Sequence, residues 1–311
     1  MTARSPATIF IDGEAGTTGL QIRDRLAGLA GIEVRSIDAS QRKDAAARKD
    51  MMASVDLVVL CLPDDAAKEA VALAESLGAD SPKIVDASTA HRVAPGWVYG
   101  FAELDATQSA SIAKANLVAN PGCYPTGAIA LLRPLIDAGL IPADWPLTIN
   151  AVSGYSGGGK SMIEAYQGAR APLFELYGLG LEHKHVPELM AYAGLTRRPI
   201  FVPSVGNFSQ GMLVSIPLHL DNLPAKPSLA GLEAALEKHY AGAELVRVVK
   251  GAAQCLGGRI AGETLAGSDM LELCVFGNQK FDQAVLVARL DNLGKGAAGA
   301  AVQNIKLMLG I

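Results

Sequence analysis

Residues 8–19 read TIFIDGEAGTTG, in which an apolar run is followed by three evenly spaced glycines. The apolar run predicts a buried strand over residues 8–12, and the apolar spacing of residues 17–30 predicts a helix. Glycines between a strand and a helix let the backbone approach a pyrophosphate, which the free N–H groups of the helix start can bind. A glycine-rich turn without a ligand is the alternative. We predict a dinucleotide-binding loop, formed by Gly13, Gly16, Thr17, Thr18 and Gly19.

Short strands and helices alternate through the rest of the first third of the chain. This alternation is typical of βαβ units and a parallel sheet. The expected strands cover 33–38, 56–62 and 83–88, and a helix covers 64–77. From residue 147 onward, longer strand-like runs with few helices predict a mainly antiparallel sheet with helical cover. These runs are 201–205, 212–220, 245–249, 270–276 and 284–290, and an Ala-rich helix over 295–309 closes the chain.

Composition excludes several classes of protein. The 311 residues are half apolar and carry a net charge of −4, with no basic patch for nucleic acid. Residues 1–8 are too polar for a signal peptide, and no apolar run approaches the length of a membrane span. The four cysteines show neither a CxxC pair nor metal-ligand spacing, which predicts reduced thiols and no metal site. We expect a soluble, cytoplasmic protein.

The end of the second strand predicts which dinucleotide is bound. An acidic residue there favours a free ribose hydroxyl, whereas Arg and Ser favour a 2′-phosphate. Arg35 and Ser36, followed by Arg42 and Lys43, favour NADP, while Asp38 keeps NAD open. A solvated charged loop is an equally simple explanation of Arg42 or Lys43 taken singly.

Cys123 lies in the segment 120–127, NPGCYPTG, ahead of an apolar helix over 128–138. Pro and Gly place the cysteine at a sharp turn, and the positive end of the following helix lowers the pKa of a thiol in that position. The other cysteines lie in or near apolar runs and are expected to pack as small hydrophobic residues. A purely structural cysteine in such a turn is the alternative.

Two of the five histidines, His183 and His185, lie in the segment 182–188, EHKHVPE. Histidine is the usual acid–base partner of a catalytic thiol. Pro187 and Glu188 predict a helix start, where a carboxylate can cap the helix or orient an imidazole. We predict His185 as the acid–base group, with His183 second.

Two further segments have the composition of ligand-binding loops. Residues 153–160, SGYSGGGK, offer backbone N–H groups and the cation of Lys160 to an anionic or nicotinamide-bearing ligand. Residues 291–296, DNLGKG, join the last strand to the last helix, and the Asn292 amide there could reach a cofactor ring or cap the helix.

Together these segments resemble N-acetyl-gamma-glutamyl-phosphate reductases of arginine biosynthesis, in the shorter of the two forms of that family. The resemblance spans nearly the whole chain in family order. It is carried by residues 10–19, 61–67, 86–92, 120–127, 183–188 and 291–304.

The resemblance implies a Rossmann NADP-binding domain over 1–121, completed by the C-terminal helix 292–311. An α+β catalytic and oligomerisation domain over 122–291 is implied, similar to that of glyceraldehyde-3-phosphate dehydrogenase, in a homo-oligomer (dimer or tetramer). Cys123 becomes the nucleophile and one of the two histidines the acid–base group. Further expected cofactor contacts are Pro63, Ser88, Ser156, Gly157 and Asn292. Expected substrate contacts are Arg92, Asn120, Lys160, Lys184 and Glu188.

The implied reaction is NADPH-dependent reduction of an acyl phosphate, N-acetyl-L-glutamyl 5-phosphate, to its semialdehyde through a cysteine thioester, with release of phosphate. Two alternatives stay open at this point. One is an aspartate-semialdehyde dehydrogenase-type reductase, which applies the same chemistry to a shorter acyl phosphate. The other is a non-catalytic dinucleotide-sensing regulator, which would bind NADPH without forming an aldehyde.

Overall fold

The computed structural model describes residues 5–311, which fall into two compact units. The first unit contains the residues up to Ala102, together with Ala106–Pro121 and Ala297–Ile311. The second contains Glu103–Asp105 and Gly122–Gly296. The chain therefore enters the second unit at Gly122, but it returns to the first unit at Ala297 and not at residue 292.

The first unit is built on a six-stranded sheet in the order β2-β1-β3-β4-β6-β5, with every neighbouring pair parallel. The order reverses between β1 and β3, and ligands bind at the carboxyl ends of strands at such a switch point. The strands are β1 (Ala7–Asp12), β2 (Ile32–Arg35), β3 (Leu57–Leu60), β4 (Lys83–Asp86), β5 (Val98–Tyr99) and β6 (Leu117–Ala119).

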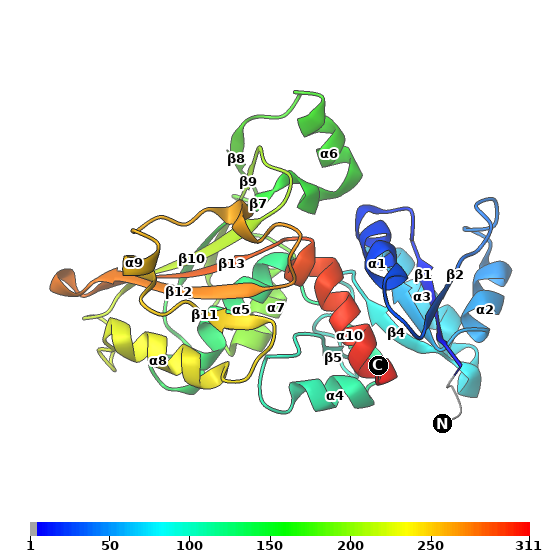
Figure 1. Cartoon of the computed structure of the whole chain (residues 1–311), viewed down its shortest axis with the longest axis horizontal. Coiled ribbons are helices and arrows are strands. Elements are labelled where there is room, and N and C mark those ends of the chain that lie inside the picture. Colours follow the sequence, from blue (N-terminus) through cyan, green and yellow to red (C-terminus); the bar gives the residue numbers. More distant parts are fainter. Residues whose placement is uncertain (1–4) are drawn as a thin grey trace. The chain divides into compact units, whose positions relative to one another are not determined.

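Helices cover both faces of this sheet (Figure 1). One apolar cluster joins the sheet to α1 (Thr17–Ala27), α4 (Gln108–Lys114) and α10 (Gly299–Leu309). A second cluster joins the other face to α2 (Ala45–Ala53) and α3 (Asp64–Glu75), while η1 (Gly78–Asp80) is a short 3₁₀ turn after α3. These layers position the carboxyl ends of β1 and β3 beside the glycine loop.

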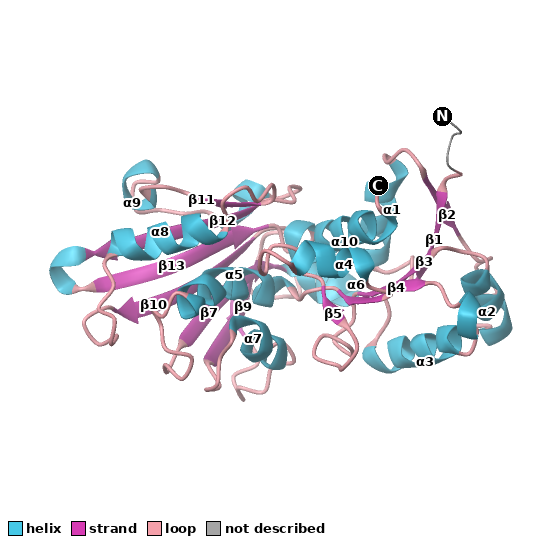
Figure 2. Cartoon of the chain, turned by 90° about the horizontal axis from the view of Figure 1, so that it is seen from below, coloured by secondary structure: helices cyan, strands magenta, loops and turns pink. Residues whose placement is uncertain are grey.

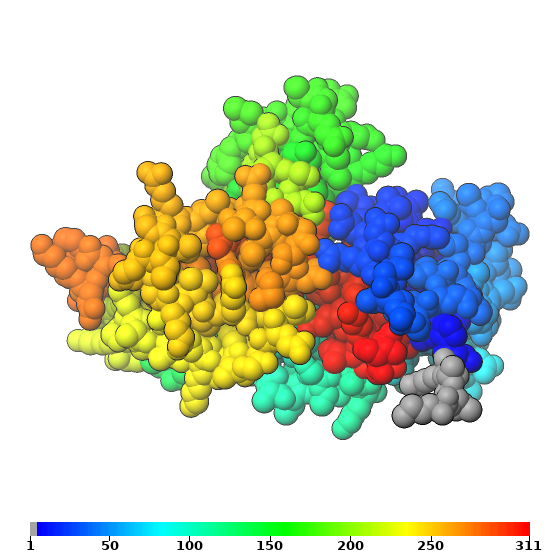
Figure 3. All heavy atoms as spheres, viewed as in Figure 1, coloured from blue at the N-terminus to red at the C-terminus, as the bar shows by residue number. Residues whose placement is uncertain are grey.

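The last helix, α10, packs beside α1, so the two ends of the chain share one core. Figure 3 shows these C-terminal residues in red against N-terminal residues in blue. Lys83 Nζ donates to Met308 O at 2.7 Å, and Asn304 Nδ2 donates to Gly100 O at 3.0 Å. Hydrogen bonds from a half-buried lysine and a buried asparagine thus fix α10 against β4 and against the residue that follows β5.

The second unit is built on a seven-stranded mixed sheet in the order β11-β12-β13-β10-β7-β9-β8. The pairs β7–β9 and β11–β12 are parallel and the others are antiparallel, so the sheet is mainly antiparallel as expected. The strands are β7 (Thr148–Gly154), β8 (Phe174–Leu176), β9 (Ile200–Gly206), β10 (Met212–His219), β11 (Val246–Val248), β12 (Leu271–Asn278) and β13 (Gln283–Leu290).

Helices α5 (Cys123–Asp137) and α8 (Leu229–His239) pack on this sheet (Figure 2). At Gly127 an added Cβ would lie 2.9 Å from Val214 Cγ2, so glycine lets α5 approach β10 closely. The other elements are α6 (Gly159–Gln167), α7 (Val186–Ala193), α9 (Ala252–Cys255), the 3₁₀ turns η2 (Tyr155–Gly158), η3 (Gly262–Leu265) and η4 (Gln279–Phe281), and the π-helical turn η5 (Gly294–Ala298). Among residues 5–311, no helix is long and apolar enough to cross a membrane.

Candidate active site

The loop between β1 and α1 is shaped by two glycines. Gly13 has φ of +89°, and a Cβ there would lie 2.3 Å from Cys61 O at the end of β3. A Cβ at Gly19 would lie 2.5 Å from Gly13 O. Gly16 provides no side chain to cap α1, whose first turn also contains no acidic residue. The three glycines therefore form a tight loop. It leaves the backbone N–H groups at the start of α1, at Thr17 and Thr18, suited to binding an anion.

Beside this loop, the residues after β2 meet a carboxylate. Glu14 accepts hydrogen bonds from Ser36 Oγ and Arg42 Nη2, each at 2.8 Å, and from Arg23 Nη1. Arg35 points elsewhere, because Nη1 donates to Ser54 O at 2.8 Å and Nε pairs with Glu33 at 2.9 Å. Of the predicted 2′-phosphate ligands, the structure thus brings Ser36 and Arg42 together and separates them from Arg35.

Arg23 completes this cluster but was missed by the sequence analysis. Its side chain, on α1, is about half exposed. No sequence motif distinguishes Arg23 from the other charged residues of that helix. Only the packing of α1 beside β2 brings its guanidinium to the Ser36 hydroxyl, at 2.8 Å.

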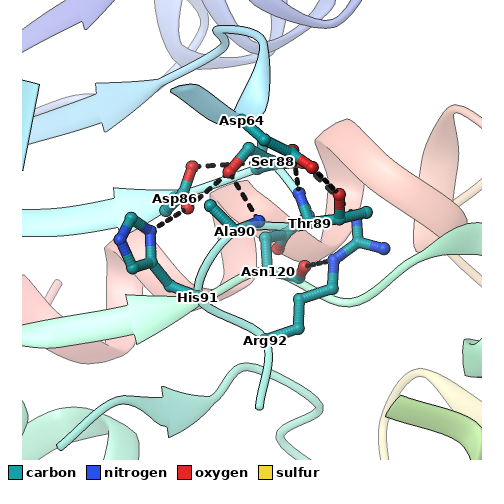
Figure 4. Close-up of polar contacts among 9 residues, drawn as sticks. Asp64, Asp86, Ser88, Thr89, Ala90, His91, Arg92 and Asn120 are labelled. Carbon is teal, nitrogen blue, oxygen red and sulfur yellow. Dashed lines mark hydrogen bonds and ion pairs between the residues drawn. The ribbon is translucent and has the colours of Figure 1, made fainter. Parts of the chain in front are cut away.

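The loop after β4 is held by two carboxylates (Figure 4). Asp86 accepts hydrogen bonds from Ser88 N at 2.9 Å and Ser88 Oγ at 2.7 Å, and it lies 2.6 Å from His91 Nδ1. Thr89 N donates to Asp64 Oδ1 at 2.9 Å. Asp64 is the first residue of α3, and Pro63 directly precedes it. The predicted cofactor contacts Pro63 and Ser88 therefore lie on two loops that are joined by the hydrogen bond between Thr89 and Asp64.

Arg92 and Asn120 are buried inside the first unit. Arg92 Nε donates to Asn120 O at 3.0 Å (Figure 4), and Asn120 Nδ2 donates to Ala297 O at 2.9 Å. Asn304 Nδ2 in turn donates to Asn120 Oδ1 at 3.1 Å. The Asn120 amide thus holds the start of the returning C-terminal segment, and the substrate-binding role of both residues stays a prediction.

Cys123 is the first residue of α5, half-buried, and preceded by Gly122 as the N-cap. Glu188 Oε2 accepts a hydrogen bond from Gly122 N at 3.1 Å, which joins α7 to the turn before the thiol. A Cβ at Gly296 would lie 2.9 Å from Cys123 Cβ, so the π-helical turn passes directly against Cys123. The thiol therefore lies at the positive end of a helix, where a thiolate is favoured.

Both histidines lie beside the first turn of α5. The Tyr124 ring centroid is 5.9 Å from that of His185 and 6.2 Å from that of His183. His183 Nδ1 accepts a hydrogen bond from His185 N at 3.1 Å. Burial, with a smaller effect of Lys184, lowers the pKa of His183 to about 4, so its imidazole is neutral near pH 7 and Nδ1 can act as an acceptor.

Two tyrosines extend this group. Tyr177 Oη donates to Tyr124 Oη at 3.1 Å, and Tyr124 Oη donates to Ser204 O at 2.9 Å. Burial raises the pKa of Tyr177 to about 12, and the nearby Cys123 adds to the increase. Burial also raises the pKa of Tyr124. Tyr177 was missed by the sequence analysis, because it lies in a segment without a recognisable motif.

Three predicted cofactor contacts meet within the second unit. Asn292 Nδ2 donates to Ser156 Oγ and its Oδ1 accepts from Gly211 N, both at 2.9 Å. A Cβ at Gly157 would lie 3.3 Å from Asn292 Nδ2. Asn292 therefore fastens η2 to the end of β13, and this anchoring keeps residues 292–296 in the second unit. Asp291, to which the sequence analysis gave no role of its own, supports this anchoring by accepting a hydrogen bond from Gly267 N at 2.7 Å.

The two predicted lysines lie on the surface. Lys160, on α6, lies 3.9 Å from Glu164 and its side chain is 85% exposed. Lys184 is exposed between the two histidines. Lys184 is thus next in sequence to the two predicted acid–base histidines, whereas Lys160 belongs to the exposed side of a separate helix.

The remaining cysteines differ in their surroundings. Burial raises the pKa of Cys61 to about 12 and that of Cys274 to about 11, with nearby carboxylates adding to both increases. Cys255 is exposed at the end of α9, contrary to the expectation that it packs as a hydrophobic residue.

The chain matches two family models, described as "Semialdehyde dehydrogenase, NAD binding domain" over residues 12–112 and "Semialdehyde dehydrogenase, dimerisation domain" over residues 123–292. Proteins named N-acetyl-gamma-glutamyl-phosphate reductase from Brucella ovis and Brucella canis are each 57% identical to it over 307 residues. The alignments cover 97% of this chain and 98% of theirs. The chain belongs to the N-acetyl-gamma-glutamyl-phosphate reductase family. The predicted family, the oxidoreductase class and the NADP-dependent chemistry are confirmed by this membership.

Solved structures support the predicted fold class. Aspartate semialdehyde dehydrogenase II from Vibrio cholerae, in complex with ASA, aligns with a TM-score of 0.72 at 16% identity over 99% of both chains. The enzyme from Francisella tularensis aligns with a TM-score of 0.73 at 12% identity, covering 98% of this chain and all of its own. At these identities the comparison concerns the fold, which is a Rossmann domain followed by an α+β domain.

Proposed function

We propose that the chain reduces N-acetyl-L-glutamyl 5-phosphate to N-acetyl-L-glutamate 5-semialdehyde with NADPH, releasing phosphate, in arginine biosynthesis. The observation that carries this proposal is Cys123 at the start of α5, near Tyr177 and followed by Tyr124, whose ring packs against His183 and His185. Relatives with this reductase name are 57% identical over nearly the whole chain, which favours this substrate over the shorter acyl phosphate of aspartate-semialdehyde dehydrogenases.

The chemistry begins at the sulfur of Cys123. Its thiolate attacks the acyl carbon, and the bond from that carbon to the phosphate oxygen breaks, leaving a thioester and inorganic phosphate. NADPH supplies the hydride that reduces the thioester carbon. The resulting tetrahedral thiohemiacetal collapses by cleavage of the carbon–sulfur bond, which releases the aldehyde and returns the thiolate. Backbone N–H groups of the first turn of α5 stabilise the oxyanion.

His185 is the proposed acid–base group. It protonates the tetrahedral oxyanion and recovers that proton as the carbonyl re-forms. His183, neutral and already accepting a hydrogen bond at Nδ1, is suited to holding substrate through its other nitrogen. Glu188, bonded to Gly122 N, holds the turn that carries the thiol.

The chain's own residues fit the dinucleotide. The absence of a Cβ at Gly13 and Gly19 leaves the loop tight enough for its backbone to bind a pyrophosphate. Ser36 and Arg42 offer a hydroxyl and a guanidinium to a 2′-phosphate. Pro63 and Ser88 on the first unit, and Ser156, Gly157 and Asn292 on the second, are the proposed contacts to the remainder of the cofactor.

The remaining proposals concern the substrate anion, assembly and location. We propose that Lys184 binds the anionic group of the substrate, and we rank it ahead of Lys160, Arg92 and Asn120 for this role.

We propose a homo-oligomer, dimer or tetramer, formed through the second unit. Free cysteines at all four positions support a reducing, cytoplasmic location.

The reaction run backwards tests the proposal most directly. Enzyme is mixed with phosphate, NADP and N-acetyl-L-glutamate 5-semialdehyde, and NADPH formation is followed by absorbance. Aspartate semialdehyde in the same assay is the matched substrate control. Faster turnover of aspartate semialdehyde would assign the chain to the other reductase activity. NADPH binding without turnover of either aldehyde would favour a regulator.

A further inference from the structure

The glycine loop contains a buried carboxylate that pyrophosphate binding does not require. Glu14 lies between Gly13 and Gly16 and is only 8% exposed. Its two oxygens accept from Ser36 Oγ and Arg42 Nη2 at 2.8 Å, and Arg23 Nη1 donates to the same oxygen as Ser36. One side chain therefore engages a hydroxyl and two guanidinium groups, all within the first unit.

These three donors form the type of site that binds a phosphate monoester. Ser36 directly follows β2, where this fold distinguishes a ribose 2′-hydroxyl from a 2′-phosphate. Guanidinium groups bind phosphate oxygens in the same way as carboxylate oxygens, so Glu14 and a phosphate compete for Arg23 and Arg42. A cavity of about 190 Å³ lies beside them, lined by Glu14, Arg42 and the apolar Ile37. An adenosine group in this cavity would bring its ribose close to the same donors.

We propose that Glu14 takes the place of the cofactor's 2′-phosphate in the cofactor-free enzyme and gives up its partners when NADPH binds. The inference deepens the proposed function and rests on it. A phosphate near −2 and a carboxylate at −1 repel each other when they share the same cations. NADH lacks this phosphate and leaves the Glu14 contacts in place. Glu14 therefore determines cofactor specificity by weakening NADPH binding more than NADH binding.

A purely structural role for Glu14 predicts the opposite result. If its carboxylate held Ser36 and Arg42 in the orientation that a phosphate needs, its removal would weaken NADPH binding. Arg35 provides an internal comparison, since it pairs with Glu33, which is about half exposed, outside the cluster. The direction of the change in affinity therefore separates the two roles.

The test compares two neutral variants of matched size, Glu14→Gln and Glu33→Gln. Dissociation constants are measured by calorimetry for NADPH and NADH, and for the fragments 2′,5′-ADP and 5′-AMP, at one ionic strength. In Glu14→Gln we expect NADPH and 2′,5′-ADP to bind about tenfold more tightly, the size of one charged contact made available. NADH and 5′-AMP should bind as in the wild type. Glu33→Gln should leave all four constants unchanged.

A second change on the Glu14→Gln background identifies the partner. Adding Arg42→Gln should abolish the tighter binding of NADPH and 2′,5′-ADP, because the Arg42 guanidinium released from Glu14 is the group that binds the 2′-phosphate. Glu14→Ala, checked by thermal unfolding, replaces Glu14→Gln should that variant fail to fold. Weaker binding of 2′,5′-ADP, no change, or an equal gain for 5′-AMP would each overturn the inference. A wild-type enzyme that binds neither NADPH nor 2′,5′-ADP would contradict the proposed function itself.

Discussion

Cys123 differs from the other three cysteines in its position at a helix start. Cys61 and Cys274 are protected by burial, which raises the pKa of both thiols, whereas Cys255 is exposed. We expect iodoacetamide at neutral pH to label Cys123 before Cys61 and Cys274, and the acyl phosphate to protect it. The experiment is best done in a Cys255→Ser background, with peptide mapping of the labelled sites.

Replacing the proposed nucleophile, Cys123, then separates an effect on the chemistry from an effect on packing. Cys123→Ser and Cys123→Ala should fold, bind NADPH and lose turnover, because a hydroxyl is far less ionised than a thiol near pH 7 and a methyl group cannot attack. Intact turnover in Cys123→Ala would remove the thioester mechanism.

His183 gives a second test at the residue scale, through its pKa of about 4 in the folded protein. The unfolded chain titrates near the ordinary value of about 6.5, so between the two values it binds more protons than the folded chain. The free energy of unfolding should therefore fall as the pH drops from about 6.5 toward 4. In His183→Gln this contribution disappears, and urea unfolding across the window should show a shallower pH dependence.

His219→Gln, which changes an exposed histidine on β10, is the matched control. It should keep the wild-type pH dependence. Equal slopes for His183→Gln and the wild type would mean that His183 accepts protons freely in the folded protein.

At the scale of elements, the π-helical turn Gly294–Ala298 packs against the start of α5. A Cβ at Gly296 would lie 2.9 Å from Cys123 Cβ and 3.0 Å from Asp291 O. Gly296→Ala must therefore displace the thiol or the turn. A displacement of about 1 Å costs on the order of 10²-fold in rate, so kcat should fall by about that factor. Gly28→Ala, where an added Cβ meets open space, should keep the wild-type kcat in the same steady-state assay.

At the scale of the whole molecule, β8 ends the larger sheet as an edge strand with exposed apolar side chains. Leu173 is 77% exposed and Phe174 is 57% exposed. Three further exposed apolar residues are Leu176 at the end of β8, Leu179 shortly after it and Ile200 at the start of the neighbouring strand β9. Exposed apolar edge strands favour association, and the matching family model is described as a dimerisation domain. We expect light scattering to show a homo-oligomer that the pair Leu173→Asp and Phe174→Asp shifts to lower mass.

Phe281→Asp is the control for this prediction. Phe281 is 59% exposed in the turn between β12 and β13, away from the edge strand, and its replacement should leave the mass unchanged. An unaltered mass in the double variant would place the interface elsewhere on the second unit.

The sequence by itself determined those features that depend on local pattern. The strand–glycine–helix spacing of residues 8–19 predicted the Rossmann loop, because glycine adopts the positive φ of Gly13 without side-chain strain and, lacking a Cβ, permits the close approach at Gly19. The Pro-Gly-Cys turn predicted a helix after the thiol, over 128–138, and the helix in fact begins five residues earlier, at Cys123 itself. The break between units at Pro121–Gly122 falls beside this start. Each of these is a relation between residues close together in the chain.

Only the tertiary structure decided which distant charges meet. Arg35 and Arg42 look equivalent in the sequence, yet Arg35 binds Ser54 O while Arg42 binds Glu14. Arg23 and Tyr177 carried no local signal, and packing alone brings them to the glycine loop and to Tyr124. The reason is physical: apolar periodicity selects the face that an element buries, but the partner of a long polar side chain depends on how the elements pack.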